Sequence, residues 1–239
     1  MSEKPLAISI LAAGKGTRMN SSIPKVLHKI NNRPMISSVI SISKKFNPEK
    51  LIAIVGYKKN LVIDALKDDE VIFVTQKEQK GTAHAIQQCN KELEGFDGNL
   101  LVLSGDVPLI TKDTINSLIS SHNQNGSKAS MLTTIFKNPT GYGRIVRNSN
   151  KTFKKIVEHK DANNEELKIN EINAGIYIFD SRTLFEKINL IKNKNTQNEY
   201  YIVDIFNFLD SNEISIYKTK NSSEIAGVNT KSQLLKMNQ

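Results

Sequence analysis

A glycine-rich turn near the start of the chain has the residue types that hold phosphate groups. Residues 11–19 read LAAGKGTRM and follow an apolar run at 6–11, which predicts a buried first strand. The backbone N–H groups of such a turn can approach phosphate oxygens closely. Arg18 and Lys25 add two fixed positive charges beside it. This combination is suited to binding a nucleoside triphosphate.

The spacing of the glycines excludes two familiar phosphate-binding loops. A P-loop requires four residues between its first glycine and the Gly-Lys-Ser/Thr group, whereas a single residue separates Gly14 from Gly16. The dinucleotide-binding loop requires a third glycine at the position of Met19. Without Arg18 and Lys25, an ordinary tight turn would be the simpler interpretation.

An aspartate follows a later apolar run that also predicts a strand. Asp106 comes just after the run at 100–104, and ligands of open α/β sheets bind at the carboxyl edge of the strands. An aspartate before Val-Pro is also a common turn residue. With a phosphate-binding turn upstream, we interpret Asp106 as a metal ligand.

A glutamine follows the expected strand at 71–75. The side chain of Gln76 can both donate and accept hydrogen bonds, as reading the edge of a base requires. Gly81, at the start of the next helical segment, permits a close backbone approach. Thr82 could contact a ligand there, or serve only as the cap of the helix.

The elements that must position these residues alternate between strands and helices through the first 135 residues. The expected strands are 7–11, 51–55, 71–75, 100–104 and 129–135, and the expected helices are 35–45, 58–67, 82–93 and 112–122. This alternation predicts βαβ units and a mostly parallel sheet. The uniformly apolar strands predict a sheet covered on both faces.

The pattern changes after Pro139. The expected strands are 143–147, 153–158, 173–179, 214–219 and 224–228, and the expected helices are 181–189, 199–209 and 231–237. Because no linker divides the chain, we expect residues 1–239 to form a single domain with halves of about 1–138 and 139–239.

The composition limits the class of protein. The chain has 239 residues with 38% hydrophobic content, which is enough for a substantial core. A single cysteine, Cys89, excludes a disulfide framework and a cysteine-based zinc site. We expect Cys89 to behave as a small buried hydrophobe.

The net charge of +9 is spread along the chain rather than clustered. A basic surface attracts small polyanionic substrates. Nucleic acid is not expected as a partner, because aromatic residues make up only 6% of the chain and no nucleic-acid motif is present. With no apolar run near twenty residues and no signal peptide, we expect a cytoplasmic protein without a membrane segment.

Six further segments, together with residues 11–19, resemble the signature of the nucleotidyltransferases that activate sugar 1-phosphates. These segments are 76–85, 104–109, 141–145, 157–161, 171–176 and 227–229. From about residue 6 onward they follow that superfamily's order with similar spacing. Within it, the pattern looks like the N-terminal half of the bacterial bifunctional N-acetylglucosamine-1-phosphate uridyltransferase/acetyltransferase family. The resemblance implies a Rossmann-like, mixed and mostly parallel α/β sheet flanked by helices, with a nucleotide-binding and a sugar-binding half.

The resemblance also implies a reaction. In this family a sugar-phosphate oxygen attacks the α-phosphorus of UTP, giving UDP-N-acetylglucosamine, a cell-wall precursor, and pyrophosphate. The nucleophile is already an anion, so the protein must mainly align two polyanions and neutralise their repulsion. The implied catalytic residues are Arg18 and Lys25, with Mg²⁺ held by Asp106 and Asn229.

The substrate-binding positions implied by the resemblance lie in all seven segments or next to them. They are Leu11, Ala12, Ala13, Gly14, Lys25, Gln76, Gly81, Thr82, Ser104, Gly105, Asp106, Gly143, Glu158, Asn173 and Asn229. Gln76 matches the family's uracil reader, and Gly143, Glu158 and Asn173 match positions that grip the sugar.

Two departures from the family's pattern bear on the identity of the sugar. Ser104 stands where relatives often carry a tyrosine beside the N-acetyl group, and Ala174 replaces a common threonine. Glu158 also has an alternative role, since it could pair with Lys160 on a solvated strand.

Other functions stay open at this point. The acceptor could be another hexose or amino-sugar 1-phosphate, or the chain could be a non-catalytic nucleotide-sugar-binding subunit. The bifunctional family continues into a β-helix of hexapeptide repeats that carries the acetyltransferase, but this chain has no such repeats and ends ten residues after Asn229. We therefore expect neither acetyltransfer nor the associated trimer, and an acetyltransferase on a separate chain is a partner to test.

Overall fold

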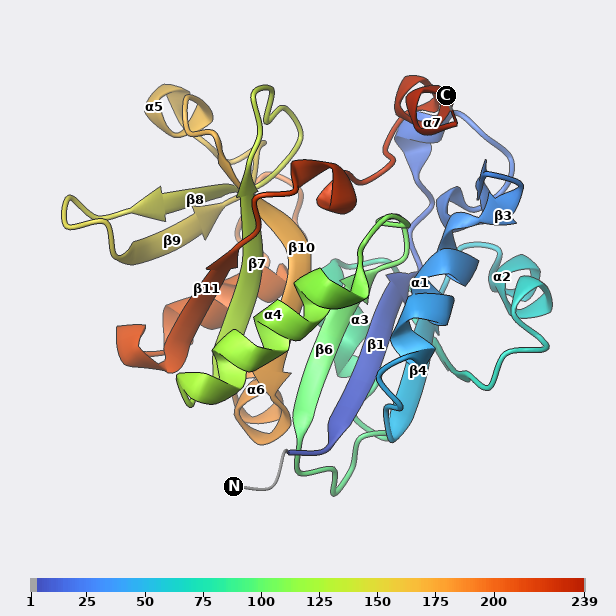
Figure 1. Ribbon diagram of the computed structural model, residues 1–239, viewed down its shortest axis with the longest axis horizontal. Helices are drawn as coiled ribbons and strands as arrows, with labels where there is room; N and C mark the ends of the chain where they lie inside the picture. The colour runs from blue at the N-terminus through green and yellow to red at the C-terminus, as the bar shows by residue number, and fades with distance from the viewer. Residues whose placement is uncertain (1–3, 239) are drawn as a thin grey trace.

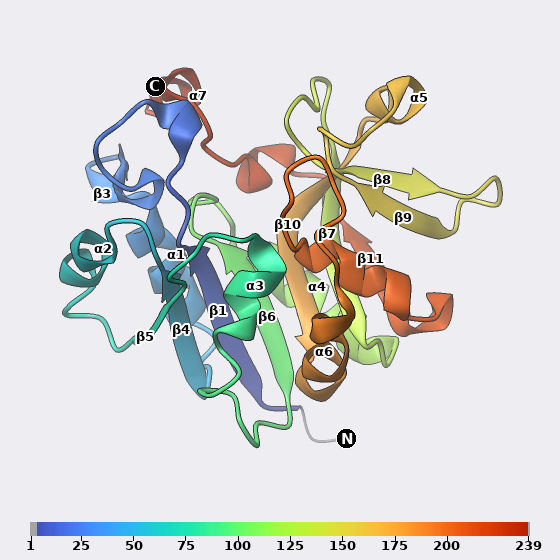
Figure 2. The same cartoon turned by 180° about the vertical axis from the view of Figure 1, so that it is seen from behind.

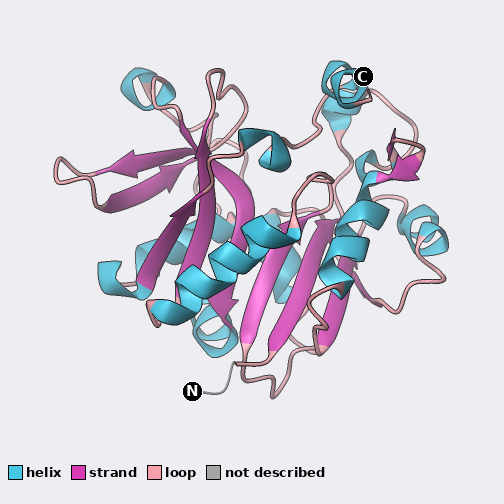
Figure 3. Ribbon diagram, in the orientation of Figure 1, coloured by secondary structure: helices cyan, strands magenta, loops and turns pink. Residues whose placement is uncertain are grey.

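The computed structural model describes residues 4–238. In this part of the chain a nine-stranded mixed sheet forms the centre of the molecule (Figure 1 and Figure 3). Seven strands follow the order β11-β7-β10-β6-β1-β4-β5, while β8 pairs with β10 and β9. The strands are β1 (Leu6–Ala12), β4 (Lys50–Val55), β5 (Ile72–Thr75), β6 (Asn99–Ser104), β7 (Ala129–Ile135), β8 (Arg144–Arg147), β9 (Phe153–Val157), β10 (Glu171–Asp180) and β11 (Ile214–Lys218). A separate small hairpin joins β2 (Lys29–Ile30) to β3 (Arg33–Pro34).

The strand directions confirm the predicted mixed, mostly parallel sheet. β1 pairs in parallel with β4 and β6, β4 with β5, and β11 with β7. The antiparallel pairs are those of β10 with β6, β7 and β8, and that of β8 with β9. The pairing of β10 with β7 is irregular between Asn173 and Tyr177, where Gly175 adopts a φ of 71° that favours glycine.

Helices cover both faces of the sheet. Figure 1 shows α1 and α4 in front of the strands, and Figure 2 shows α3 and α6 on the opposite face. The α-helices are α1 (Met35–Lys44), α2 (Lys59–Ala65), α3 (Thr82–Gln87), α4 (Lys112–Gln124), α5 (Asn164–Leu167), α6 (Ser181–Lys187) and α7 (Lys231–Met237). Short 3₁₀ segments are η1 (Thr17–Met19), η2 (Lys25–Leu27), η3 (Ile188–Leu190), η4 (Ile202–Phe208), η5 (Ser211–Glu213) and η6 (Ser222–Ile225). None of the helices in residues 4–238 has the length and apolar character that a bilayer crossing requires.

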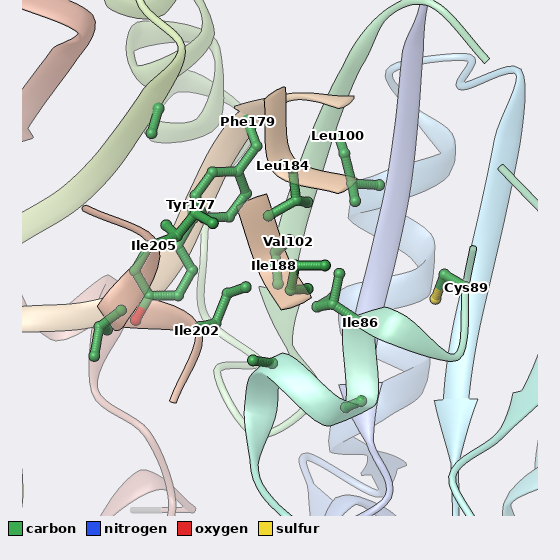
Figure 4. Close-up of a cluster of buried hydrophobic side chains, with 14 of the residues drawn as sticks. Ile86, Cys89, Leu100, Val102, Tyr177, Phe179, Leu184, Ile188, Ile202 and Ile205 are labelled. Carbon is green, nitrogen blue, oxygen red and sulfur yellow. The ribbon is translucent and has the colours of Figure 1, made fainter. Parts of the chain in front are cut away.

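Two apolar cores lie on the two faces of the sheet. One packs α3, α6 and η4 against the sheet, and Figure 4 shows Tyr177, Phe179 and Leu184 at its centre. The rings of Tyr177 and Phe179 are stacked with centroids 5.8 Å apart. Cys89 is fully buried in this core, as predicted, and burial raises the pKa of its thiol to about 12. The second core lies beneath α1 and α4.

Several predicted elements differ from the structure. The prediction of a strand at 224–228 is wrong, because the segment begins within η6. The side chain of Glu224 also anchors it by hydrogen bonds to α4 and its N-cap. The Glu224 carboxylate accepts hydrogen bonds from the hydroxyls of Thr111 (2.8 Å) and Thr114 (2.6 Å). The helix predicted at 199–209 is the 3₁₀ segment η4, and α3 ends at Gln87 instead of residue 93.

Candidate active site

The candidate site lies at the carboxyl ends of β1 and β6, beside the irregular part of β10. Two adjoining pockets of about 310 and 270 Å³ open there and share Leu11, Thr82, Ser104, Asp106 and Glu199. Fourteen of the fifteen predicted substrate-binding positions line one pocket or both, as does Arg18. The exception is Gly105, whose backbone N–H donates to the Leu11 carbonyl (3.0 Å).

The glycine-rich turn bends so that Lys25 can pack beneath it. Gly16 adopts a φ of 66°, and a Cβ atom at this position would lie 2.5 Å from the Cβ of Lys25. Glycine is therefore required here for both its backbone angle and its size. A Cβ at Gly14 would meet no atom within 4 Å, so that residue borders open space.

Four charged or polar side chains converge below the turn. Lys25 Nζ forms an ion pair with Asp106 Oδ2 and donates to Asn229 Oδ1 (3.2 Å). Arg18 Nη2 donates to the same Asn229 oxygen (2.9 Å). The Val228 N–H donates to the Asp106 carbonyl (3.1 Å), so the segment carrying Asn229 is fixed to the end of β6.

The oxygens of Asp106 and Asn229 both face one cation, the Lys25 ammonium group. A carboxylate and an amide oxygen are the hard donors that Mg²⁺ prefers, with waters and phosphate oxygens completing its shell. In residues 4–238, no group of three or more His, Cys, Asp or Glu side chains could hold a metal ion. The donor set of this site therefore fits a weakly held Mg²⁺ better than a caged transition metal.

Gln76 is held by its amide nitrogen. Nε2 donates to the Gly81 carbonyl (3.0 Å) and lies 3.0 Å from Nδ1 of His84. The side chain is 3% exposed, so its orientation is fixed. This arrangement engages both amide hydrogens of Gln76 and leaves Oε1 as the group that can accept from a ligand.

The helix-capping role considered for Thr82 is wrong. Gly81, with a φ of 109°, occupies the N-cap of α3, and no side chain caps the helix. The Thr82 hydroxyl instead accepts a hydrogen bond from the Ile202 N–H (2.9 Å), which fixes the start of η4. A Cβ at Gly81 would lie 2.5 Å from the Tyr200 carbonyl oxygen, so glycine is needed for this contact.

The predicted sugar-binding residues meet in the larger pocket. A Cβ at Gly143 would lie 3.1 Å from Glu158 Oε1, and the Asn173 N–H donates to the Gly143 carbonyl (2.9 Å). The side chain of Asn173 donates to the Tyr177 hydroxyl (2.6 Å) and accepts from the Gly175 N–H (3.1 Å). Its amide is therefore oriented before any ligand binds.

Glu158 is the most perturbed carboxylate of the pocket. Burial, followed by the nearby carboxylates of Asp161 and Asp204, raises the pKa of Glu158 to about 7. The pairing of Glu158 with Lys160 considered from the sequence is not found in the described part of the chain, and the positive charge that acts on Glu158 is that of Arg144.

Ser104 connects the two strands that carry the site. Its hydroxyl donates to the Gly175 carbonyl (3.1 Å), which joins the end of β6 to the irregular part of β10. Serine, which is shorter than the tyrosine often found here in relatives, therefore has a structural role at position 104, next to the predicted sugar-binding residues.

Sequence reasoning missed three groups of residues near the site. His84 orients Gln76, and Gln197, Glu199 and Tyr201 line the larger pocket from the segment before η4. Gln233 accepts hydrogen bonds from the backbone N–H groups of Asn229 (2.7 Å) and Thr230 (3.1 Å). The capping box formed by Thr230 and Gln233 has a recognisable Thr-x-x-Gln spacing that could have revealed it.

Known proteins share sequence with this chain. A family model described as nucleotidyl transferase matches residues 7–222. The bifunctional protein GlmU of Clostridium novyi (strain NT) is 46% identical over 226 residues, which cover 94% of this chain and 50% of that protein. GlmU of Prochlorococcus marinus (strain NATL2A) is 43% identical over 230 residues, covering 96% and 51%. The chain thus spans about half the length of the curated relatives it matches.

A solved structure shares the fold. The structure of UDP-glucose pyrophosphorylase complexed with UDP-glucose superposes with a TM-score of 0.74 at 21% sequence identity. The match covers 98% of this chain and 97% of that one. This likeness supports the mixed, mostly parallel sheet flanked by helices described above.

Proposed function

The chain belongs to the nucleotidyl transferase family, and we propose that it transfers UMP from UTP to N-acetylglucosamine 1-phosphate. The products are UDP-N-acetylglucosamine and pyrophosphate. The observation that carries this proposal is the convergence of Arg18, Lys25, Asp106 and Asn229 beside the pocket of Glu158. A binding protein alone would not need two cations and an oxygen pair at the same point.

The proposed reaction requires alignment and charge neutralisation. A phosphate oxygen of the sugar 1-phosphate forms a bond to the α-phosphorus of UTP. The bond from that phosphorus to the bridging oxygen of the β-phosphate breaks, and pyrophosphate leaves with the electron pair. We propose that Arg18 and Lys25 offset the repulsion between these anions, and no general base is required.

We propose that Asp106 and Asn229 hold Mg²⁺, because their oxygens already face a common cation. When bound, Mg²⁺ would neutralise charge on the reacting phosphate. In the structure Lys25 forms an ion pair with Asp106 and thereby keeps the Asp106 side chain oriented toward the glycine-rich turn, which we call the phosphate turn below.

The fixed amide of Gln76 supports uracil as the base. Its nitrogen is engaged by Gly81 and His84, so Oε1 can accept a hydrogen bond. The uracil ring offers an N–H donor at the edge where cytosine offers an acceptor. A mismatched base would leave buried polar groups unpaired, which costs affinity.

The sugar assignment rests on Glu158, Gly143 and Asn173. Glu158 can accept hydrogen bonds from sugar hydroxyls, and Asn173 is oriented by Gly175 and Tyr177. Another hexose or amino-sugar 1-phosphate is the alternative acceptor, because Ser104 is committed to the Gly175 carbonyl.

A pyrophosphate-release assay over a matrix of nucleoside triphosphates and sugar 1-phosphates tests the proposal. We expect activity to be highest with UTP and N-acetylglucosamine 1-phosphate at saturating Mg²⁺. Equal or higher kcat/KM with glucose 1-phosphate would change the assigned sugar, and a preference for CTP or GTP would overturn the uridyl assignment. The cytoplasmic location and the separate acetyltransferase partner stay predictions from the sequence.

A further inference from the structure

A tyrosine in the wall of the larger pocket is bonded to the segment that carries Asn229. Tyr142 lies between β7 and β8, is half-buried, and lines this pocket beside the predicted sugar-binding residues. Its hydroxyl accepts a hydrogen bond from the Gly227 N–H (3.1 Å), across 85 positions of sequence. The bond therefore connects the sugar side of the site to a residue two positions before the proposed metal ligand.

The position of the Tyr142 side chain is fixed by its surroundings. The carbonyl of Tyr142 accepts a hydrogen bond from the guanidinium of Arg144, a side chain that is only 1% exposed. The N–H of Tyr142 donates to the Pro139 carbonyl (3.1 Å). Its ring packs edge-on against Phe136, with centroids 5.0 Å apart, an arrangement that aromatic pairs favour. The hydroxyl is thus held in place before any ligand binds.

Three successive backbone N–H groups anchor segment 227–229 to different parts of the molecule. Their acceptors are, in chain order, the Tyr142 hydroxyl, the Asp106 carbonyl and the Gln233 side chain. The first acceptor lies in the wall of the larger pocket, the second follows β6 and the third is on α7. Because these anchors belong to separate elements, together they fix the backbone from which the Asn229 side chain extends.

Gly227 adjoins both proposed metal ligands. A Cβ atom at Gly227 would lie 3.6 Å from Asn229 Nδ2 and 3.8 Å from Asp106 Oδ2. A displacement of Gly227 would therefore reach both side chains. Mg²⁺ demands near-ideal octahedral geometry with short bonds to oxygen, so a small change in the spacing of its ligands weakens binding.

We propose that Tyr142 is a positioning residue of the metal site, because its hydroxyl fixes Gly227 and, through Gly227, the placement of Asn229 against Asp106. This inference rests on the proposed function. It gives Tyr142 a role in metal binding although its ring lines the sugar side of the site.

Kinetics at varied Mg²⁺ test the proposal with Tyr142→Phe, which removes the acceptor of the Gly227 N–H and keeps the ring against Phe136. Tyr217→Phe is the matched control, because Tyr217 is also half-buried but lies on β11 and lines neither pocket of the site. We expect Tyr142→Phe to raise the Mg²⁺ concentration for half-maximal rate about three- to tenfold, as for the loss of one neutral hydrogen bond.

The KM for the sugar 1-phosphate distinguishes positioning from direct contact. At saturating Mg²⁺ this KM should stay within about twofold of the wild-type value in Tyr142→Phe, since the hydroxyl acts through Gly227. A raised KM for the sugar with an unchanged Mg²⁺ requirement would show that the hydroxyl binds the sugar itself and would overturn the proposal. An unchanged Mg²⁺ requirement by itself would also overturn it.

A binding measurement separates this inference from the proposed reaction. Calorimetric titration of UTP into each folded protein, without sugar 1-phosphate, gives one Kd in EDTA and one in Mg²⁺. We expect Mg²⁺ to strengthen UTP binding about three- to tenfold less in Tyr142→Phe than in wild type or Tyr217→Phe, with equal Kd values in EDTA. This result would support the positioning role even if no sugar nucleotide is made. Equal strengthening in the three proteins would exclude it, whether or not pyrophosphate is released.

Discussion

The proposed phosphate side and the proposed sugar side of the candidate site hold their charges in different ways. On the phosphate side Asp106 is paired with Lys25, and Arg18 shares the Asn229 oxygen with Lys25. On the sugar side Glu158 is half-buried near the charges of Asp161 and Asp204, and its pKa rises to about 7. One side is stabilised by opposite charges in contact, whereas the other contains a carboxylate whose ionisation is opposed by its surroundings. The comparison indicates that pH should affect sugar binding more than phosphate alignment.

The largest effect is expected from removing the carboxylate of the phosphate side. Asp106→Ala deletes the proposed metal ligand and leaves Lys25 without its ion pair, so kcat should fall at least about 10²-fold. Steady-state pyrophosphate release at saturating Mg²⁺ measures this. Asp69→Ala, which breaks the ion pair with Lys44, is the control and should keep normal turnover. Near-normal turnover of Asp106→Ala would remove Asp106 from the catalytic cluster.

A smaller loss is expected when the phosphate turn is distorted without changing any charge. In Gly16→Ala the added Cβ would lie 2.5 Å from the Cβ of Lys25, so Lys25 must move and kcat should fall about 10- to 100-fold. Gly95→Ala is the matched control, because Gly95 also has a positive φ (72°) but nothing lies within 4 Å of its Cβ position. Both variants should lose about 1–2 kcal/mol of unfolding free energy from backbone strain. Equal activities in the two variants would show that the position of Lys25 is not critical.

On the sugar side, a change of pH should alter the charge of Glu158 without a mutation. The KM for the sugar 1-phosphate should fall about fivefold as pH rises through about 7, because ionised Glu158 accepts stronger hydrogen bonds. Glu158→Gln should remove this dependence, and Glu165→Gln, at an exposed position, should retain it. A pH profile that is identical in wild type and Glu158→Gln would contradict the role of this carboxylate.

The same pKa shift predicts a change in stability. The pKa of Glu158 is raised in the folded protein, so between its ordinary value of 4.5 and about 7 the folded state holds more protons than the unfolded state. Its contribution to the free energy of unfolding therefore decreases as pH rises through this range. The free energy of unfolding, measured by chemical denaturation, should decrease more between pH 5 and pH 8 for wild type than for Glu158→Gln.

The smallest effect is expected from the residue that orients the base reader. His84→Ala removes the acceptor for Gln76 Nε2, so the ratio of kcat/KM for UTP over CTP should fall about two- to fivefold. His84→Asn places an amide oxygen near the position of Nδ1 and should restore most of the preference. An unchanged ratio in His84→Ala would show that the Gly81 carbonyl alone is sufficient to orient Gln76.

Residues that directly follow predicted strands could be placed from the sequence. Asp106 and Gln76 come just after β6 and β5, and parallel strands bring such positions to one edge of the sheet. The mostly parallel sheet was also predictable, because apolar strands alternate with helical segments in the first half of the chain. The burial of Cys89 was predictable from its residue type, although Cys89 lies in the turn after α3 and not on the predicted helix.

Contacts between segments far apart in the sequence could not be predicted. The bond from the Ile202 N–H to Thr82 and the contact of His84 with Gln76 depend on packing that no local pattern encodes. The strand wrongly predicted at 224–228 contains Ile225 and Val228, which are apolar because they enter two different cores. An apolar spacing alone does not reveal that Thr111 and Thr114 hold Glu224 in place.

The bond between Arg18 and Asn229 has a consequence for biosynthesis. It joins side chains 211 positions apart, so the phosphate turn leaves the ribosome long before its partner. The entropic cost of closing such a long loop grows only slowly with length, but contacts between distant segments form late in folding. Helix and sheet signals should therefore recover during refolding before pyrophosphate release does. Catalytic competence would then report that the polypeptide has been folded through to α7.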